Sequence, residues 1–240
     1  MGNNYNDNGN ENNKVHGVMD GAPAYQTESL FYVVPEEENG DKEEKIWRIG
    51  NKTIEDYLAL PDERRVELID GVFYDMAAPS YVHQIIALKI FQILLNHVEK
   101  NGGSCMPFAA PADVQLFCDS DKTMVQPDVF VVCDKDRITM NRLLGAPDLV
   151  MEVVSPGSRR RDADLKLRKY RESGVREYWI IFPDDQQVWV YDLESARTMQ
   201  SEDLVPQVYT FTDKVPVGIW EGKCEVDFAE IYERCRFLYE

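Results

Sequence analysis

Three acidic residues of this sequence stand near the ends of segments that resemble β-strands. Asp128 follows a proline in QPDVFVV, Glu152 lies within DLVMEVVS, and Glu67 lies within VELIDG. Apolar residues flank Glu152 on both sides, so its carboxylate needs a strong partner, because an unpaired buried charge is very costly. Carboxylates that converge from neighbouring strands can hold Mg²⁺ or Mn²⁺, hard ions that take oxygen ligands. The pattern therefore predicts a divalent-metal site, and the alternative for each residue is a solvated side chain on an open sheet face.

A second aspartate that follows a proline, Asp148, competes with Asp128 as the partner of Glu152. Asp148 and Glu152 belong to one predicted strand and would stand about 13 Å apart, which is too far to share an ion. Asp128 must come from another strand. We therefore expect Asp128 to be the partner.

Hydrolysis at such a site also needs a cation that orients water or offsets developing charge. Strand alternation puts Val154 on the same face as Glu152, so the nearest position is apolar. In the next predicted helix, Asp162, Lys166 and Tyr170 are four residues apart and share one face. Lys166 is the candidate ammonium group, and the alternative is an Asp162–Lys166 ion pair on the surface.

The elements that must position these residues alternate between helix and strand. Thr53 predicts a helix start, Asp70-Gly71 predicts a hairpin turn within 66–76, and Ser80 predicts the start of a helix that runs to about Lys100. Further strands are expected at 112–118, 126–133, 147–154, 177–182 and 188–193, with a helix at 160–173 that ends before Gly174. Short strands near 206–220 and a helix at 227–238 complete an α/β or mixed α+β layout, with a central sheet flanked by helices.

Other polar and aromatic residues near these elements have weaker signals. His83 could approach the site from the start of its helix, but we expect it to have a capping or core role. Tyr170, Tyr178 and Trp179 are expected to pack beneath the site. The run Arg159, Arg160 and Arg161 could contact phosphates, and its alternative is a solvated helix start.

Composition limits the partners and the compartment. A net charge of −17 argues against nonspecific binding to nucleic-acid backbones, which requires clustered Lys and Arg. The five cysteines have no C-x2-C spacing and suggest neither a zinc site nor a disulfide framework, so we expect them to be reduced. No stretch is apolar enough to span a membrane and the N-terminus has no secretory pattern, so we expect a cytoplasmic protein with no membrane partner.

The chain is expected to divide into a tail and one globular region. Residues 1–46 are Asn-rich and acidic and predict a disordered tail and linker. Residues 47–240 are expected to form a single domain, with a C-terminal β and helix extension over about 196–240.

The strings ELIDG, QPDVFVV and APDLVMEVVSPGSRRRDADLKLRKYRESGVREYWIIFP, with His83 opening a helix between the first two, carry a resemblance over about residues 50–195. They resemble the Uma-type restriction endonuclease family, part of the PD-(D/E)XK nuclease superfamily. The resemblance implies a restriction-endonuclease-like fold, a mixed central sheet with a helix on each side. It also implies metal-dependent hydrolysis of phosphodiesters, with DNA as substrate and Mg²⁺ or Mn²⁺ as cofactor.

The resemblance also implies roles for individual residues. Asp128 matches the superfamily's Pro-Asp aspartate and Glu152 its second carboxylate, with the Val153 carbonyl as a further metal ligand. Glu67 matches an extra acidic residue that completes such sites. Val154 stands where the superfamily motif has lysine, and Lys166 fits the displaced lysine of the Uma-type family.

Two rival functions and the oligomeric state stay open at this point. The domain could have kept the fold and lost the chemistry, and the acidic surface and Val154 favour such a binding module. It could also hydrolyse RNA or another phosphodiester, because substrate choice resides in loops. A homodimer would suit cleavage of both strands of a duplex.

Overall fold

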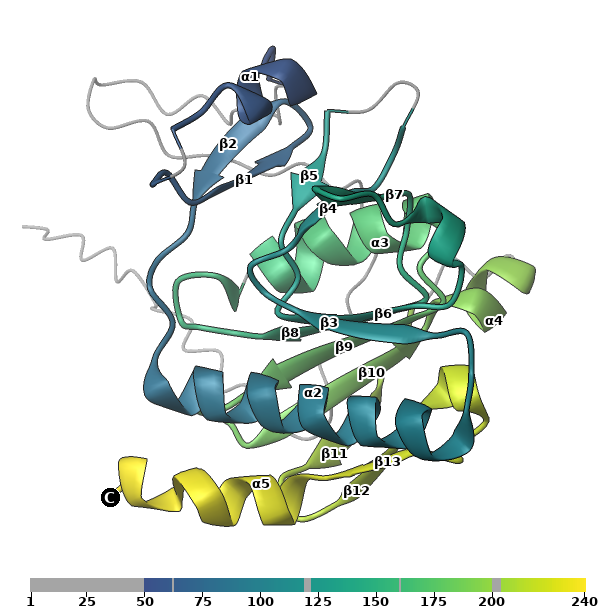
Figure 1. The fold of residues 1–240 in the computed structure, drawn as a ribbon. Coiled ribbons are helices and arrows are strands. Elements are labelled where there is room, and N and C mark those ends of the chain that lie inside the picture. Colours follow the sequence, from purple (N-terminus) through teal and green to yellow (C-terminus); the bar gives the residue numbers. More distant parts are fainter. Residues whose placement is uncertain (1–49, 62, 119–121, 160, 200–203) are drawn as a thin grey trace, which may run out of the picture.

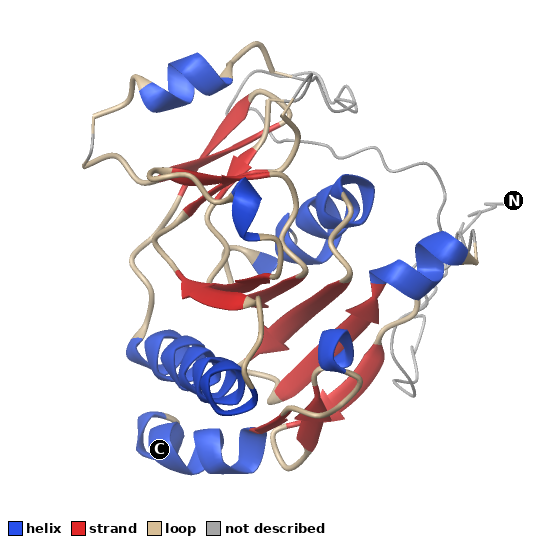
Figure 2. Cartoon of the chain, turned by 45° about the vertical axis from the view of Figure 1, so that its right-hand side comes forward, coloured by secondary structure: helices blue, strands red, loops and turns tan. Residues whose placement is uncertain are grey.

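The computed structural model describes residues 50–61, 63–118, 122–159, 161–199 and 204–240. Within them the chain forms a mixed α/β fold in which helices and a second sheet cover a central sheet (Figures 1 and 2). This confirms the predicted fold class. The predicted tail, residues 1–46, lies outside the described residues.

The central sheet has six strands in the order β11-β10-β9-β8-β6-β3. Their bounds are β3 Met106–Ala109, β6 Val129–Val132, β8 Leu149–Val153, β9 Glu177–Phe182, β10 Gln187–Asp192 and β11 Gln207–Thr210. β8 and β9 are parallel, and the other neighbouring pairs are antiparallel. Both middle strands are buried along their whole length, in agreement with their nearly continuous apolar sequences.

A second sheet of five strands, in the order β2-β1-β5-β4-β7, lies above the central one in Figure 1. Its strands are β1 Val66–Ile69, β2 Val72–Asp75, β4 Asp113–Gln115, β5 Met124–Val125 and β7 Arg142–Leu144. The predicted hairpin is confirmed. Its turn residues Asp70 and Gly71 have φ values of 51° and 78°, the left-handed conformation that a two-residue hairpin turn requires.

The predicted helices begin and end close to their expected positions, while α4 (Leu193–Thr198) was not predicted. Ser80 caps α2 (Tyr81–Asn101), and Gly102 follows its last turn. The predicted helix at 160–173 is a π-helical segment, η2 (Arg161–Lys166), continued by α3 (Leu167–Ser173), with Gly174 in the left-handed conformation. The remaining helices are α1 Ile54–Leu58, α4 Leu193–Thr198, α5 Phe228–Cys235 and the 3-10 turns η1 Lys135–Arg137, η3 Gly218–Trp220 and η4 Arg236–Leu238.

The two faces of the central sheet are covered by different elements (Figure 1). α2 and α5 pack on one face, where Ile90 and Leu94 of α2 meet Trp179 and Phe228. On the other face, α3 and the second sheet enclose a core that includes Val150, Tyr170 and Tyr178. Glu152 belongs to this second face, because Val150 and Val154 on either side of it along the strand pack there.

The C-terminal segment contributes to both the central sheet and its cover. β11 extends the sheet beyond β10, while β12 (Lys214–Pro216) pairs with β13 (Glu225–Asp227) in a two-stranded sheet. Val215 and Val226 of this pair join the core beneath α2. The predicted short strands and C-terminal helix are therefore present.

The expectation of five reduced cysteines was wrong. Cys105 and Cys133 form a disulfide, while Cys118, Cys224 and Cys235 are free. The two bonded cysteines adjoin the antiparallel strands β3 and β6, whose pairing of Met106 with Val132 brings them opposite each other. The two cysteines are far apart in sequence, and the strand register brings them close together. The sequence alone therefore gave no sign of the disulfide.

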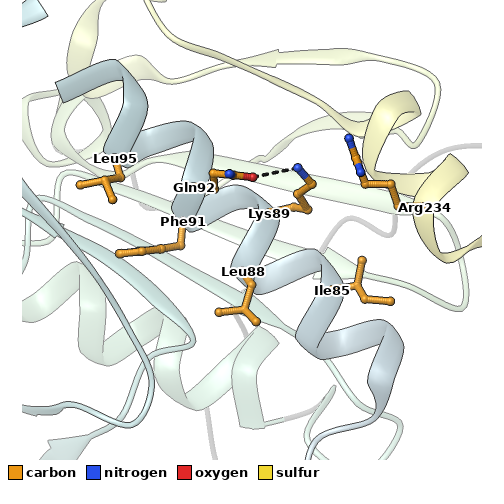
Figure 3. A pocket seen from close by; sticks show the side chains of 7 residues that line it. All are labelled: Ile85, Leu88, Lys89, Phe91, Gln92, Leu95 and Arg234. Carbon is orange, nitrogen blue, oxygen red and sulfur yellow. Dashed lines mark hydrogen bonds between the residues drawn. The ribbon is translucent and has the colours of Figure 1, made fainter. Parts of the chain in front are cut away.

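Two surface properties bear on partners. Within the described residues no helix is long and apolar enough to cross a membrane. The outward side of α2 carries a groove of about 580 Å³ whose apolar lining includes Ile85, Leu88 and Phe91, and Lys89 and Arg234 also line it (Figure 3).

Candidate active site

The two central carboxylates come from neighbouring antiparallel strands, as predicted. β6 and β8 pair Val129 with Met151, so the next position in the register sets Asp128 opposite Glu152. The backbone N–H of Val153 donates to Asp128 Oδ2 at 2.8 Å. The start of one strand is thereby fixed to the end of the other, and Glu152 faces the side that α3 covers.

Glu152 is 3% exposed, which contradicts the alternative of a solvated carboxylate. Its Oε1 accepts hydrogen bonds from Lys166 Nζ at 2.9 Å and from the Tyr170 hydroxyl at 2.7 Å. Burial raises the pKa of Glu152 to about 8. Lys166 lowers this pKa, but the nearby carboxylates of Asp128, Asp162 and Glu67 raise it further. The predicted strong partner of Glu152 is therefore Lys166, supported by a tyrosine.

Lys166 is also 3% exposed and lies among three carboxylates. Besides Glu152, its Nζ lies 2.8 Å from Glu67 Oε1 and 3.5 Å from Asp162 Oδ1. Although burial alone lowers the pKa of Lys166, the surrounding carboxylates, Glu152 first, raise it well above its usual value. The alternative of a surface pair between Asp162 and Lys166 is wrong, because both side chains are buried.

The π-helical segment η2 directs Asp162 and Lys166 toward the interior. Within this segment Asp162, Leu165 and Lys166 are buried. The Tyr178 hydroxyl donates to the Asp162 carbonyl at 3.0 Å, so a buried tyrosine supplies a partner for this backbone group. Irregular helical turns of this kind are frequent at functional sites.

Glu67 reaches the site from β1 of the second sheet and is fully buried. Its Oε1 accepts from the backbone N–H of Gln126 at 3.1 Å as well as from Lys166. Its Oε2 is buried without a hydrogen bond within the described residues, and Arg161 Nε stands 3.7 Å away. The solvated alternative is therefore wrong for Glu67 too, and the second sheet contributes a carboxylate to the cluster.

The expected capping or core role of His83 was wrong. Ser80, not His83, caps the helix, its hydroxyl oxygen accepting from the backbone N–H of His83 at 3.2 Å. The imidazole Nε2 lies 3.0 Å from Asp128 Oδ2. Packing of the start of α2 against the start of β6, which local sequence does not encode, brings this histidine to the site.

The predicted aromatic support divides between the two faces of the sheet. Tyr170 and Tyr178 stack in a tilted pair beneath the carboxylates, as predicted. Trp179 points to the opposite face, where its Nε1 donates to Glu177 Oε1 at 2.6 Å. The prediction was therefore wrong for Trp179, because strand alternation turns it away from its neighbour Tyr178 and into the other core.

The arginine run has two described members with different surroundings. Arg159 pairs with Asp185 and lies over the Phe182 ring, with half of its side chain exposed. Arg161 is partly buried between Glu67 and the Tyr74 ring. Arg160 lies outside the described residues.

Asp148, which sequence spacing ruled out as the partner of Glu152, has other contacts. Its side chain accepts a hydrogen bond from the Cys133 N–H at 2.8 Å.

Sequence reasoning missed a polar network that continues from Glu67 toward α1. Gln126, whose N–H donates to Glu67, also donates through its side chain to Asp113 at 2.8 Å and to the Tyr57 hydroxyl at 3.1 Å. The Tyr57 hydroxyl in turn donates to Asp113 at 2.8 Å. A glutamine directly before the Pro-Asp pair was the available signal.

The charge balance of the cluster suits a further cation. Three carboxylates, those of Glu152, Glu67 and Asp162, surround one ammonium group, with Arg161 at the edge, and Asp128 adds a fourth carboxylate near Glu152. Glu67 Oε2 and Asp162 Oδ1 are buried without hydrogen bonds in the described part of the chain.

Within these ranges no three His, Cys, Asp or Glu side chains are arranged to hold a metal ion. The predicted ligand set, two carboxylates and the Val153 carbonyl, does not need a third side chain. Its oxygen donors suit a hard divalent ion.

The profile of the Uma2 family, described as "Putative restriction endonuclease", matches residues 54–221. The chain belongs to this family. The match contains every described residue of the carboxylate cluster and confirms the resemblance drawn from the motifs.

Individual proteins are also similar to this chain. One is "Uncharacterized protein slr1290" of Synechocystis, 28% identical over 129 residues, which are 53% of this chain and 66% of that protein. The other is the crystal structure of "a putative nuclease belonging to DUF820" from Anabaena variabilis. It matches with a TM-score of 0.59 and 22% identity, over 75% of this chain and 97% of that one. At this identity the likeness shows a shared fold.

Proposed function

We propose that this protein is a metal-dependent endonuclease that hydrolyses phosphodiester bonds, with DNA as its substrate. The observation that carries the proposal is the position of Lys166, whose Nζ lies 2.9 Å from Glu152 Oε1. Val154 leaves the usual motif position without an ammonium group, and Lys166 supplies one from η2. The apolar residue Val154 was one of two reasons that favoured a catalytically silent module, the other being the acidic surface. The position of Lys166 weighs against the first reason.

Each residue of the cluster has a role in this proposal. Asp128, Glu152 and the Val153 carbonyl would hold Mg²⁺ or Mn²⁺, and the bound ion would polarise the phosphate and acidify a bound water. Lys166 offsets negative charge that develops on the phosphate. Tyr170 fixes the Glu152 carboxylate through its 2.7 Å hydrogen bond.

Glu67 has a different role, because it contacts Lys166 rather than the proposed metal ligands. It binds Lys166 at 2.8 Å and is itself held by the Gln126 N–H. Glu67 therefore positions the ammonium group between the second sheet and Glu152. Arg159 and Arg160 are proposed to contact flanking phosphates, and Arg161 to do so from the edge of the cluster.

Location and assembly are further parts of the proposal. A homodimer would place two sites on one duplex. A cytoplasmic location suits a nuclease acting on DNA, but the Cys105–Cys133 disulfide weighs against it, since disulfides are uncommon in that compartment.

The test is a cleavage assay on duplex DNA, RNA and a small phosphodiester, with Mg²⁺, Mn²⁺ or a chelator. The wild-type protein is compared with Asp128→Asn, Glu152→Gln and Lys166→Met, and Asp136→Asn at an exposed turn is the matched control. We expect metal-dependent DNA cleavage by the wild type and the control alone. Cleavage of RNA alone would overturn the assignment of substrate, and no cleavage by the folded protein would favour the silent module.

A further inference from the structure

The surroundings of Asp128 differ from those of the other carboxylates in the cluster. Both described hydrogen bonds of its side chain fall on one oxygen, Oδ2, which lies 2.8 Å from the Val153 N–H and 3.0 Å from His83 Nε2. Its Oδ1 makes no hydrogen bond within the described residues. The carboxylate is thus held at one oxygen and open at the other.

The contact with Asp128 determines which ring nitrogen of His83 carries the hydrogen. An ionised carboxylate only accepts hydrogen bonds, so Nε2 must donate to Oδ2. The other ring nitrogen, Nδ1, is buried and has no hydrogen-bond partner within the described residues. Nδ1 is therefore closed to solvent, and the imidazole ring of His83 makes its one described hydrogen bond to Asp128.

This burial separates two possible roles of the histidine. A group that exchanged protons with substrate would need a ring nitrogen open to the site. Here Nε2 is occupied by Asp128 and Nδ1 is enclosed, while the side chain as a whole is 15% exposed. His83 therefore acts on the carboxylate rather than on the reacting atoms.

We propose that His83 is a positioning residue that orients Asp128 so that Oδ1 is the oxygen presented to a divalent ion. The inference rests on the proposed function, because it requires Asp128 to be a metal ligand. α2 makes the arrangement rigid, since His83 lies in the first turn of a 21-residue helix whose start is capped by Ser80. Partners of metal-binding side chains typically change metal affinity 10- to 100-fold when they are removed.

Two substitutions distinguish orientation from simple packing. In His83→Gln the side-chain amide can place an N–H near the position of Nε2, whereas His83→Asn is too short to do so. Mn²⁺ affinity is measured by calorimetry, and the melting temperature of each metal-free variant is measured alongside it. His97→Gln is the matched control, because His97 lies on the same helix but stacks on Trp220, with ring centroids 4.6 Å apart.

We expect His83→Asn to weaken Mn²⁺ binding roughly 10- to 100-fold, and His83→Gln and the control to stay within about threefold of the wild type. Equal affinity in His83→Asn and the wild type would overturn the inference. Equal losses in His83→Asn and His83→Gln would do the same, since they would show a packing effect.

A measurement without metal tests the hydrogen-bond assignment independently. Long-range ¹H–¹⁵N spectra of the metal-free protein should show the hydrogen of His83 on Nε2, and a hydrogen on Nδ1 alone would overturn the inference. Failure of the wild type to bind Mn²⁺ at all would instead refute the proposed function, and the role of His83 with it.

Discussion

The two faces of the central sheet bury charge in different ways. On the face toward α2 and α5, Glu177 is the buried charged residue among those described, and its oxygens accept from Trp179 Nε1 at 2.6 Å and the Ile219 N–H at 2.7 Å. On the face toward α3, three carboxylates gather around Lys166, and two of their buried oxygens lack hydrogen bonds within the described residues. A satisfied buried charge serves the structure, whereas an excess of incompletely satisfied charge points to a site that binds something else.

Lys166→Met should have the largest effect and tests the charged face directly. The substitution leaves Glu67 and Glu152 buried without their ammonium partner, so we expect the free energy of unfolding to fall by about 3–5 kcal/mol. Cleavage by the molecules that remain folded should fall by roughly 10²- to 10³-fold. Chemical denaturation and cleavage rates check both effects.

Lys214→Met is the control for this substitution, because Lys214 is exposed and pairs with Asp227 at the surface. Surface pairs of this kind contribute roughly 0–1 kcal/mol. Equal stability losses in the two variants would remove the distinction between the charged cluster and an ordinary ion pair.

Leu94→Ala probes the apolar face. Leu94 is fully buried in the core between α2 and the sheet, so its truncation should lower the free energy of unfolding by about 2–5 kcal/mol. Cleavage by the folded fraction should stay within about twofold of the wild type. Leu88→Ala on the same helix is the control, since Leu88 is 54% exposed and lines the groove of Figure 3.

The pH dependence of stability should differ between the wild type and Glu152→Gln. Because the pKa of Glu152 is raised from 4.5 to about 8 on folding, the folded protein retains a proton that the unfolded chain releases. The free energy of unfolding without metal should therefore fall, by a few kcal/mol, as pH rises through this window. Denaturation at several pH values checks this slope, and an equally steep slope in Glu152→Gln would assign it to other groups.

Tyr170→Phe should have the smallest effect of the series. It removes one of the two hydrogen-bond donors of Glu152 Oε1, and a single hydrogen bond contributes roughly 0.5–1.5 kcal/mol. We expect a loss of that size in unfolding free energy and weaker Mn²⁺ binding. Tyr239→Phe is the control, because the Tyr239 hydroxyl donates to the Pro183 carbonyl at 3.3 Å, away from the carboxylate cluster. A similar loss of metal binding there would contradict the role of Tyr170.

Local patterns predicted the parts of the fold whose signals lie within one segment. The Asp70-Gly71 turn, the Ser80 cap and the apolar run around Glu152 each determine their structure from a few neighbouring residues. The short strands β3 and β7 were missed, because three- and four-residue strands carry little periodicity.

The proximity of Asp128, Glu152 and Lys166 was predictable, because strand order and helix spacing decide it. Proximity was not predictable where distant elements meet. The contact of His83 with Asp128 depends on how α2 packs against β6, and the burial of Glu67 depends on a second sheet. The Cys105–Cys133 disulfide likewise depends on strand register.

The central claim is that the charged face binds a divalent ion through Glu152. The most direct measurement is Mn²⁺ binding by calorimetry on the wild type and on Glu152→Ala, with circular dichroism to show that both are folded. The account predicts saturable binding by the wild type that disappears in Glu152→Ala. Absence of binding by both folded proteins would contradict it and leave Glu152 as a structural partner of Lys166.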